Sequence, residues 1–198
     1  MQGIDEVEYP EMTSHRWKLG VVRAGADVAW SCEPSYARQV VGGVPRLVIA
    51  PGGEPVRLLR ELLTLLPEPV WVLYVLITPR SEAPAGRYQS AKPHPREEVL
   101  GLLDRFEEYF ACDGRMNLWL AAPGAGQLVL DRHEVIYGYG PIAEMAGRLK
   151  EKQFAEADAI RVPVPHSHHF HEEMDADERA VLEYWEWVHS ELQETDDL

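Results

Sequence analysis

The sequence predicts an α+β fold: one mixed or mostly antiparallel β-sheet with about four helices packed on it. Three observations support this class. The longest apolar run, Pro69–Thr78, carries no charge and is rich in β-branched and aromatic residues, which is typical of a central, buried strand. The pair Gly42–Gly43 separates two extended segments, as in a β-hairpin. The stretch Arg96–Phe110 has helical spacing of its apolar residues, namely Val99, Leu103, Phe106 and Phe110.

The first third of the chain predicts two hairpins. His15–Val22 alternates apolar and polar residues, and Val28–Cys32 repeats that pattern after a turn at Ala24–Gly25. The segments Tyr36–Val41 and Val44–Ala50 flank the Gly–Gly pair. We therefore expect two antiparallel pairs before the first helix.

The middle of the chain predicts a crossover followed by a long irregular stretch. Glu54–Leu66 has a leucine stripe at helical spacing, so Leu47–Ala50 and Trp71–Thr78 are expected to be parallel neighbours. Pro79–Pro95 contains four prolines and shows no periodicity. It contains three basic residues that could hold an anionic ligand, although a mobile surface loop with charges for solubility is the preferred explanation: Arg80, Arg87 and Lys92.

The last third predicts a three-stranded meander and two helices. The strands are Arg115–Ala121, Gln127–Leu130 and Glu134–Tyr139, with a tight turn at Asp131–His133. A short amphipathic helix follows near Ile142. The final helix starts at Asp175, and its expected inward residues are Val181, Trp185, Val188 and Leu192.

On that final helix, Trp187 lies away from the inward stripe, on the same side as Glu183 and Glu191. An exposed tryptophan edged by acids is a candidate anchor for a basic partner. The alternative is that another element covers Trp187. We expect one domain over residues 15–193, between a frayed acidic N-terminus (1–14) and an acidic tail (194–198).

Composition narrows the classes of function. The 198 residues have a formal net charge of −14, which disfavours nucleic acids and anionic membranes and favours a basic protein partner. The N-terminus lacks the order of a secretory signal, so we expect a cytoplasmic protein. The sequence has no phosphate-binding loop, dinucleotide fingerprint, nucleophile elbow, H-E-x-x-H or C-x-x-C motif, which weakens an enzymatic interpretation without closing it.

The strongest chemical signal is the stretch Pro165–Glu173, PHSHHFHEE. It holds His166, His168, His169 and His171, and imidazole is a preferred ligand of zinc and related metals. Residues two apart in an extended segment share a face, so His166 and His168 could hold one ion, and His169 and His171 another. A further ligand must come from elsewhere; His133 is the first candidate and His94 the second. The alternatives are a solvated lead-in to the last helix and a pH-sensing cluster.

Two functional hypotheses follow. The first is a non-enzymatic interaction module for a basic partner, with a profile similar to that of small acidic bacterial proteins that neutralise a basic toxin or nuclease. The second is a metal-dependent hydrolase that uses a divalent ion such as zinc at the histidines, with Glu172 or Glu173 as general base. Convergence of three ligands in space would favour the second hypothesis over a surface loop.

Overall fold

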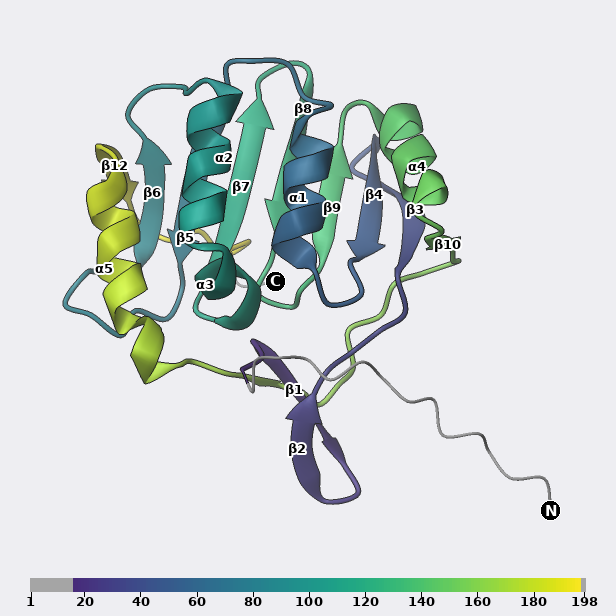
Figure 1. Cartoon of the computed structure of the whole chain (residues 1–198), viewed down its shortest axis with the longest axis horizontal. Helices are drawn as coiled ribbons and strands as arrows, with labels where there is room; N and C mark the ends of the chain where they lie inside the picture. Colours follow the sequence, from purple (N-terminus) through teal and green to yellow (C-terminus); the bar gives the residue numbers. More distant parts are fainter. Residues whose placement is uncertain (1–15, 197–198) are drawn as a thin grey trace.

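The computed structural model describes residues 16–196, so the predicted frayed segment 1–14 lies outside it. The described chain contains a nine-stranded sheet, a three-stranded sheet and five α-helices, which confirms the α+β class. Figure 1 shows the five helices in front of the large sheet and the small sheet below it. The small sheet is an addition to the single sheet that the sequence predicts.

The small sheet begins with the first predicted hairpin. Strands β1 (Leu19–Arg23) and β2 (Ala26–Ala29) pair antiparallel. Ala24 and Gly25 make the turn with φ of 50° and 83°, in the left-handed region that such turns require. On its other side β1 pairs with β11 (Ser167–His168), which comes from the far end of the chain.

The second predicted hairpin forms one end of the large sheet. Strands β3 (Ser35–Val41) and β4 (Val44–Ala50) pair across Gly42 and Gly43, whose φ values are 58° and 82°. A short strand, β10 (Ala155–Glu156), lies parallel to β3 at the sheet's edge. Every other pair in the large sheet is antiparallel.

The predicted meander forms the middle of the sheet, as β7 (Met116–Ala122), β8 (Gly126–Leu130) and β9 (Ile136–Tyr139). The strand order is β10-β3-β4-β9-β8-β7-β5-β6-β12. The predicted parallel pairing of β4 with β5 (Trp71–Leu76) is therefore wrong. Three antiparallel strands with short connections occupy the space between them, and α1 (Pro55–Leu63) crosses over that space.

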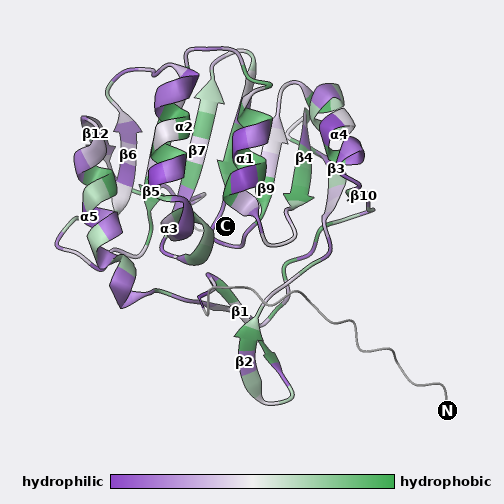
Figure 2. Ribbon diagram, viewed as in Figure 1, coloured by the Kyte–Doolittle hydropathy of each residue, from purple (hydrophilic) through white to green (hydrophobic). Residues whose placement is uncertain are grey.

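The helices pack their apolar stripes on one face of this sheet. They are α1, α2 (Arg96–Arg105), α3 (Glu107–Cys112), α4 (Ile142–Glu151) and α5 (Asp175–Tyr184), the last preceded by a 3₁₀ turn at Glu172–Met174. The single helix predicted over 96–110 is broken at Phe106, where φ is −114° and ψ is 26°. Figure 2 shows hydrophilic and hydrophobic bands alternating along α1 and α2, as expected of helices with one buried face.

Two clusters of buried apolar residues stabilise the packing of the helices and the two sheets. The larger lies between the helices and the large sheet. It packs helix residues such as Leu59 and Leu62 of α1 against strand residues such as Tyr74 of β5 and Leu118 of β7, none of which is exposed. The smaller cluster comprises Leu19, Val21, Trp30, Val48 and Val135. It joins residues of β1 to residues of the large sheet, so burial of apolar surface fixes the small sheet beneath the large one.

The C-terminal region differs most from the sequence prediction. The predicted last helix ends at Tyr184, and Trp187–Ser190 form strand β12, which pairs with β6 (Gly86–Ser90). Strand β6 itself lies inside the stretch predicted to be irregular. Once β6 offers an edge, an aromatic and β-branched segment satisfies its backbone groups better by pairing there than by continuing a helix. Val188, expected to face inward, is 58% exposed, and Leu192 is 37% exposed.

The acidic tail is also better anchored than its composition predicts. Asp196 is 3% exposed and accepts a hydrogen bond from Arg87 at 2.7 Å. Its backbone carbonyl accepts a 2.8 Å bond from the Asn117 side chain. The described part of the tail is therefore held in place up to Asp196, because the half-buried Arg87 and the buried Asn117 amide both bond to this residue.

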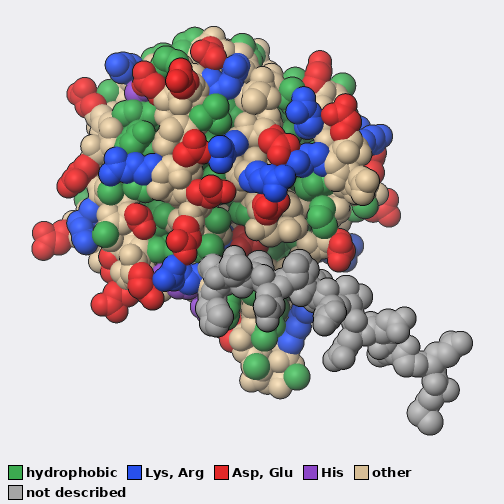
Figure 3. Space-filling model, viewed as in Figure 1, with side chains coloured by type: hydrophobic (Ala, Val, Ile, Leu, Met, Phe, Trp, Pro, Cys, Tyr) green, Lys and Arg blue, Asp and Glu red, His purple; other side chains and the backbone are tan. Residues whose placement is uncertain are grey.

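Charged side chains of both signs are interspersed over the helix-bearing face (Figure 3). Ion pairs link the helices there: Arg60 of α1 contacts Asp104 of α2 at 2.7 Å, and Lys152 contacts Glu61 at 2.8 Å. Within residues 16–196, no helix combines the length and the apolar character needed to cross a bilayer.

Candidate metal centre

The connection between β8 and β9 presents His133. Asp131 builds this turn, because its Oδ1 accepts the backbone N–H groups of His133 and Val135, each at 2.9 Å. The Asp131 N–H also donates to the Val135 carbonyl at 3.0 Å. Glu134 takes a φ of 60°, which completes the reversal. Local hydrogen bonding of an aspartate to its own turn thus sets the direction of the His133 side chain.

The histidine-rich segment runs beside β1. Leu19 pairs with His168 and Gly20 with Ser167, and the His169 N–H donates to the Lys18 carbonyl at 2.9 Å. The segment is extended, so side chains two residues apart point to the same side. His166 and His168 share the side that faces His133.

These three imidazoles form a compact cluster. The ring centroids of His133 and His166 lie 5.1 Å apart, those of His133 and His168 4.9 Å, and those of His166 and His168 5.2 Å. One ring nitrogen of each lies within 4.8 Å of the corresponding nitrogen of the other two. The rings meet edge-on, at angles of 60° to 89°, so they converge on a common point without stacking.

Hydrogen bonds determine which ring nitrogen of each histidine keeps a lone pair for a metal ion. Asp131 Oδ2 lies 3.1 Å from His133 Nδ1, and the Pro163 carbonyl lies 2.8 Å from His166 Nδ1. Both oxygens act as acceptors, so each Nδ1 carries the proton and each Nε2 keeps its lone pair. His168 Nδ1 is buried and has no hydrogen-bond partner among the described residues. The cluster therefore offers unshared lone pairs.

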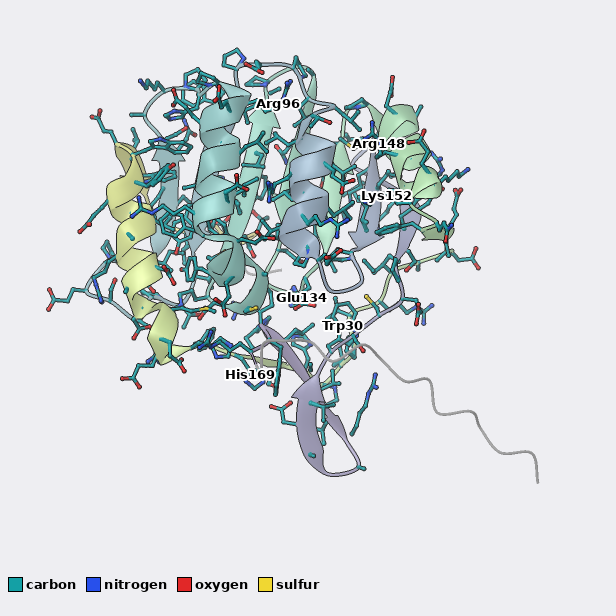
Figure 4. All side chains as sticks on the ribbon, in the orientation of Figure 1. Trp30, Arg96, Glu134, Arg148, Lys152 and His169 are labelled. Atoms are coloured by element: carbon teal, nitrogen blue, oxygen red, sulfur yellow. The ribbon has the colours of Figure 1, made fainter. Side chains whose placement is uncertain are left out.

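Burial and the neighbouring charges keep His168 neutral. Burial lowers the pKa of His168 to about 3, and the positive charge of Arg132 and the two neighbouring histidines act in the same direction. Burial also raises the pKa of Glu134 to about 7, with Lys18 opposing that rise. Figure 4 labels Glu134 in the lower part of the view, where the large sheet ends above the small one. Neutral imidazole is the form that binds a metal.

The other two histidines of the segment have different partners. His169 Nε2 lies 3.0 Å from Asp27 Oδ2 on β2, and His171 Nε2 donates to the Trp17 carbonyl at 3.2 Å. His94, the second candidate for an outside ligand, is elsewhere, stacked on Trp185 at 3.8 Å and bonded to Glu98 at 2.7 Å. Among the described histidines, the cluster unites only the predicted pair and the first outside candidate.

The candidate catalytic carboxylates are separate from this cluster. Glu172 and Glu173 lie exposed on the 3₁₀ turn before α5. Neither belongs to the group whose ligand atoms converge. The structure therefore gives no support to a general base at these two positions.

The predicted partner-binding residues are arranged differently from the expectation. Trp187 is on β12 instead of a helix, and it is half-buried against Tyr74 and Trp185, with ring centroids 6.5 Å and 5.8 Å away. Its Nε1 donates to the Val181 carbonyl at 3.1 Å. The acids Glu183 and Glu191 are exposed, but they share no helix face with Trp187. The predicted helical placement of Trp187 is therefore wrong, and its indole is half-buried and hydrogen-bonded, while the partner-binding role of these three residues stays a prediction.

The predicted anion loop is also dispersed. Arg80 pairs with Asp175 at 2.9 Å, and Arg87, on β6, pairs with the buried Asp196 at 2.7 Å. Lys92 is exposed. Two of the three cations are already neutralised by carboxylates, so they do not form the shared basic surface that the sequence suggested.

Sequence reasoning missed the residues that orient the cluster. From the sequence, Asp131 is only part of a turn, although the D-x-H spacing lets one carboxylate bond both the turn backbone and the imidazole. The Pro163 carbonyl left no sequence signal, because any residue has a carbonyl. No protein-family model matches the chain, and no curated protein or solved structure is significantly similar to it.

Proposed function

We propose that this protein binds a divalent transition-metal ion, of the zinc type, through His133, His166 and His168. The observation that carries the proposal is the convergence of three imidazoles from two separate sheets, with a ligand atom of each within 4.8 Å of the others. Three imidazoles are an established zinc ligand set.

The hydrogen bonds around the cluster support this proposal over simple packing. Ligand histidines ordinarily donate their second ring nitrogen to a carboxylate or a carbonyl, and here His133 has Asp131 and His166 has Pro163. His168 Nδ1 has no partner among the described residues, and an unpaired buried polar atom costs free energy. A bound ion would satisfy that nitrogen.

A second candidate function is metal-dependent hydrolysis, which one feature of the ligand set supports. Three protein ligands leave a coordination position open for water, as in catalytic zinc sites. Glu172 and Glu173 lie outside the cluster, so this hypothesis requires a different base. The alternative role is structural, because the ion would join the β8–β9 turn of the large sheet to β11 of the small one.

The test begins with untagged protein purified without immobilised-metal resin. We expect one metal ion per chain by mass spectrometry of the metal content, or one site in a calorimetric zinc titration of the stripped protein. His168→Ala should weaken zinc at least about tenfold, which corresponds to about 1.4 kcal/mol. His169→Ala is the matched control, because His169 belongs to the same segment but contacts Asp27. Equal loss in both variants, or no stoichiometric site in the wild type, would refute the proposal.

A further inference from the structure

The outer edge of β12 has backbone groups that face away from the sheet. β12 ends the strand order, and it pairs with β6 through Val188↔Gln89 and Ser190↔Arg87. The Ala91 N–H donates to the Glu186 carbonyl at 2.9 Å, so Glu186 and Ala91 are a hydrogen-bonded pair. Hydrogen-bonded and non-hydrogen-bonded pairs alternate along an antiparallel ladder, so the next hydrogen-bonded pairs are those of Val188 and Ser190. The N–H and C=O groups of Trp187 and His189 therefore point away from β6. Within residues 16–196, no strand pairs with them.

Exposed acids surround this edge. Glu183 precedes the strand on α5, Glu186 comes immediately before it and Glu191 immediately after it, and all three are exposed. Two copies of β12 placed edge to edge would bring these acids together, and that repulsion disfavours self-association through this edge. The same charges favour an extended segment that carries lysine or arginine.

A cavity of about 390 Å³ lies at the start of the strand, lined by Ala91, Lys92, His94, Glu98, Trp185 and Glu186. Within it, the His94 ring stacks on Trp185 with centroids 3.8 Å apart and planes 13° from parallel. The carboxylates of Glu186 and of Glu98, which also contacts His94 at 2.7 Å, suit a guanidinium or ammonium group, which gains charge pairing there. Lys92 is the one opposing charge among the lining residues.

We propose that an extended, basic segment of a partner protein adds to the outer edge of β12 as a tenth strand, with one arginine or lysine side chain in the Trp185 cavity. Main-chain bonds to Trp187 and His189 provide affinity, and the cavity provides selectivity for a basic side chain. This surface replaces the helix face predicted from the sequence as the place where a basic partner binds. It is independent of the metal site, which lies at the other sheet.

The first test uses a synthetic seven-residue peptide that begins with arginine and then alternates valine and lysine. We expect binding, with slowed amide exchange at Trp187 and His189. His189→Pro removes an outward N–H that β6 does not use, so it should weaken the peptide at least about tenfold. His189→Ala is the control, because it removes the same ring, which packs on Tyr88 at 4.8 Å, yet keeps the N–H. An equal effect of the two variants would overturn strand addition.

The second test addresses the cavity and does not depend on a proline variant that folds. Glu98→Gln combined with Glu186→Gln should weaken the same peptide about tenfold, while a peptide with glutamate in place of its basic residues should not bind wild-type protein. Absence of binding by the basic peptide up to about 1 mM, or equal binding of the acidic one, would overturn the proposal. So would a wild-type dimer in sedimentation that His189→Pro dissociates, since the occupant would then be a second copy.

Discussion

Two polar clusters join the C-terminal third of the chain to the large sheet, and they differ in how completely their atoms are paired. Around Arg115, each guanidinium nitrogen has a partner. Nε and Nη2 donate to the two oxygens of Asp113 at 2.7 Å and 2.9 Å, and Nη1 donates to Glu178 at 2.6 Å and to Asp175 at 3.0 Å. At the histidine cluster, by contrast, ring nitrogens with free lone pairs face one another.

The partners explain the difference. Arg115, Asp113 and Glu178 have no exposed side-chain surface, and opposite charges meet in good geometry. Burial alone would raise the pKa of Glu178, but its hydrogen bonds with Ser81 and Arg115 lower it. The histidine cluster brings together three groups of the same kind and leaves His168 Nδ1 unpaired among the described residues. A saturated network is complete as a structural element, whereas an unsaturated cluster has the capacity to bind something more.

The largest expected effect is at the saturated network. Arg115→Met should lower the free energy of unfolding by about 3–5 kcal/mol, because it leaves Asp113 and Glu178 buried without their cation. Urea titration followed by circular dichroism measures this loss. The control is Arg57→Met, whose side chain is 57% exposed and pairs with Glu54 and Glu61 among residues 16–196; its cost should stay below about 1 kcal/mol. Similar losses in both variants would contradict the assigned role of Arg115.

A smaller effect is expected when metal is added to the unsaturated cluster. Zinc at a free concentration one hundred times its dissociation constant should raise the free energy of unfolding by about 2.7 kcal/mol, and a chelator should reverse the gain. Because the ligands come from both sheets, amide exchange in β1, β2 and β11 should slow as well. At the same zinc concentration, His168→Ala should reduce the gain to about 1.4 kcal/mol or less, because its affinity is at least about tenfold weaker. A gain in this variant equal to that of the wild type would place the ion elsewhere.

Removing the carboxylate behind His133 tests how the cluster is oriented. Asp131→Asn should weaken zinc about 10–100-fold, since a neutral amide supports the ligand nitrogen less well than a carboxylate does. Asp27→Asn is the matched control, because Asp27 contacts His169, outside the cluster. Calorimetric titration of both variants makes the comparison, and their melting curves show whether the Asp131 turn remains folded. An unchanged affinity in Asp131→Asn would remove this residue from the site.

The smallest effect is expected at an exposed carboxylate that belongs to neither cluster. Hydrogen bonds with Tyr36 and Arg38 lower the pKa of Glu156 from 4.5 to about 2. Because the folded-state pKa is the lower one, the unfolded chain binds more protons in that range. The stabilisation is present at neutral pH and is lost as the pH falls from 4.5 to about 2. In Glu156→Gln, the free energy of unfolding should therefore fall slightly less steeply between pH 4.5 and about 2. Acid unfolding at low salt measures this slope, and a slope equal to that of the wild type would contradict the assigned partners.

Much of the fold could be predicted because its signals are local. The Gly42–Gly43 turn, the leucine stripe of α1 and the alternation in β7 each depend on residues close together in sequence. The errors arose where a distant partner decided the outcome. Trp187–Ser190 became a strand because β6 offers an edge, and three meander strands came to lie between β4 and β5.

The candidate site divides in the same way. The histidine-rich stretch alone predicts that His166 and His168 share one side of an extended segment, since side chains alternate along any strand. That this side faces His133 depends on the fold, because the pairing of β11 with β1 and the apolar contact of Leu19 and Trp30 with Val135 set the two sheets against each other. Alternation is a property of neighbouring residues, whereas the convergence of the three histidines depends on strand register and on burial between segments far apart in the chain.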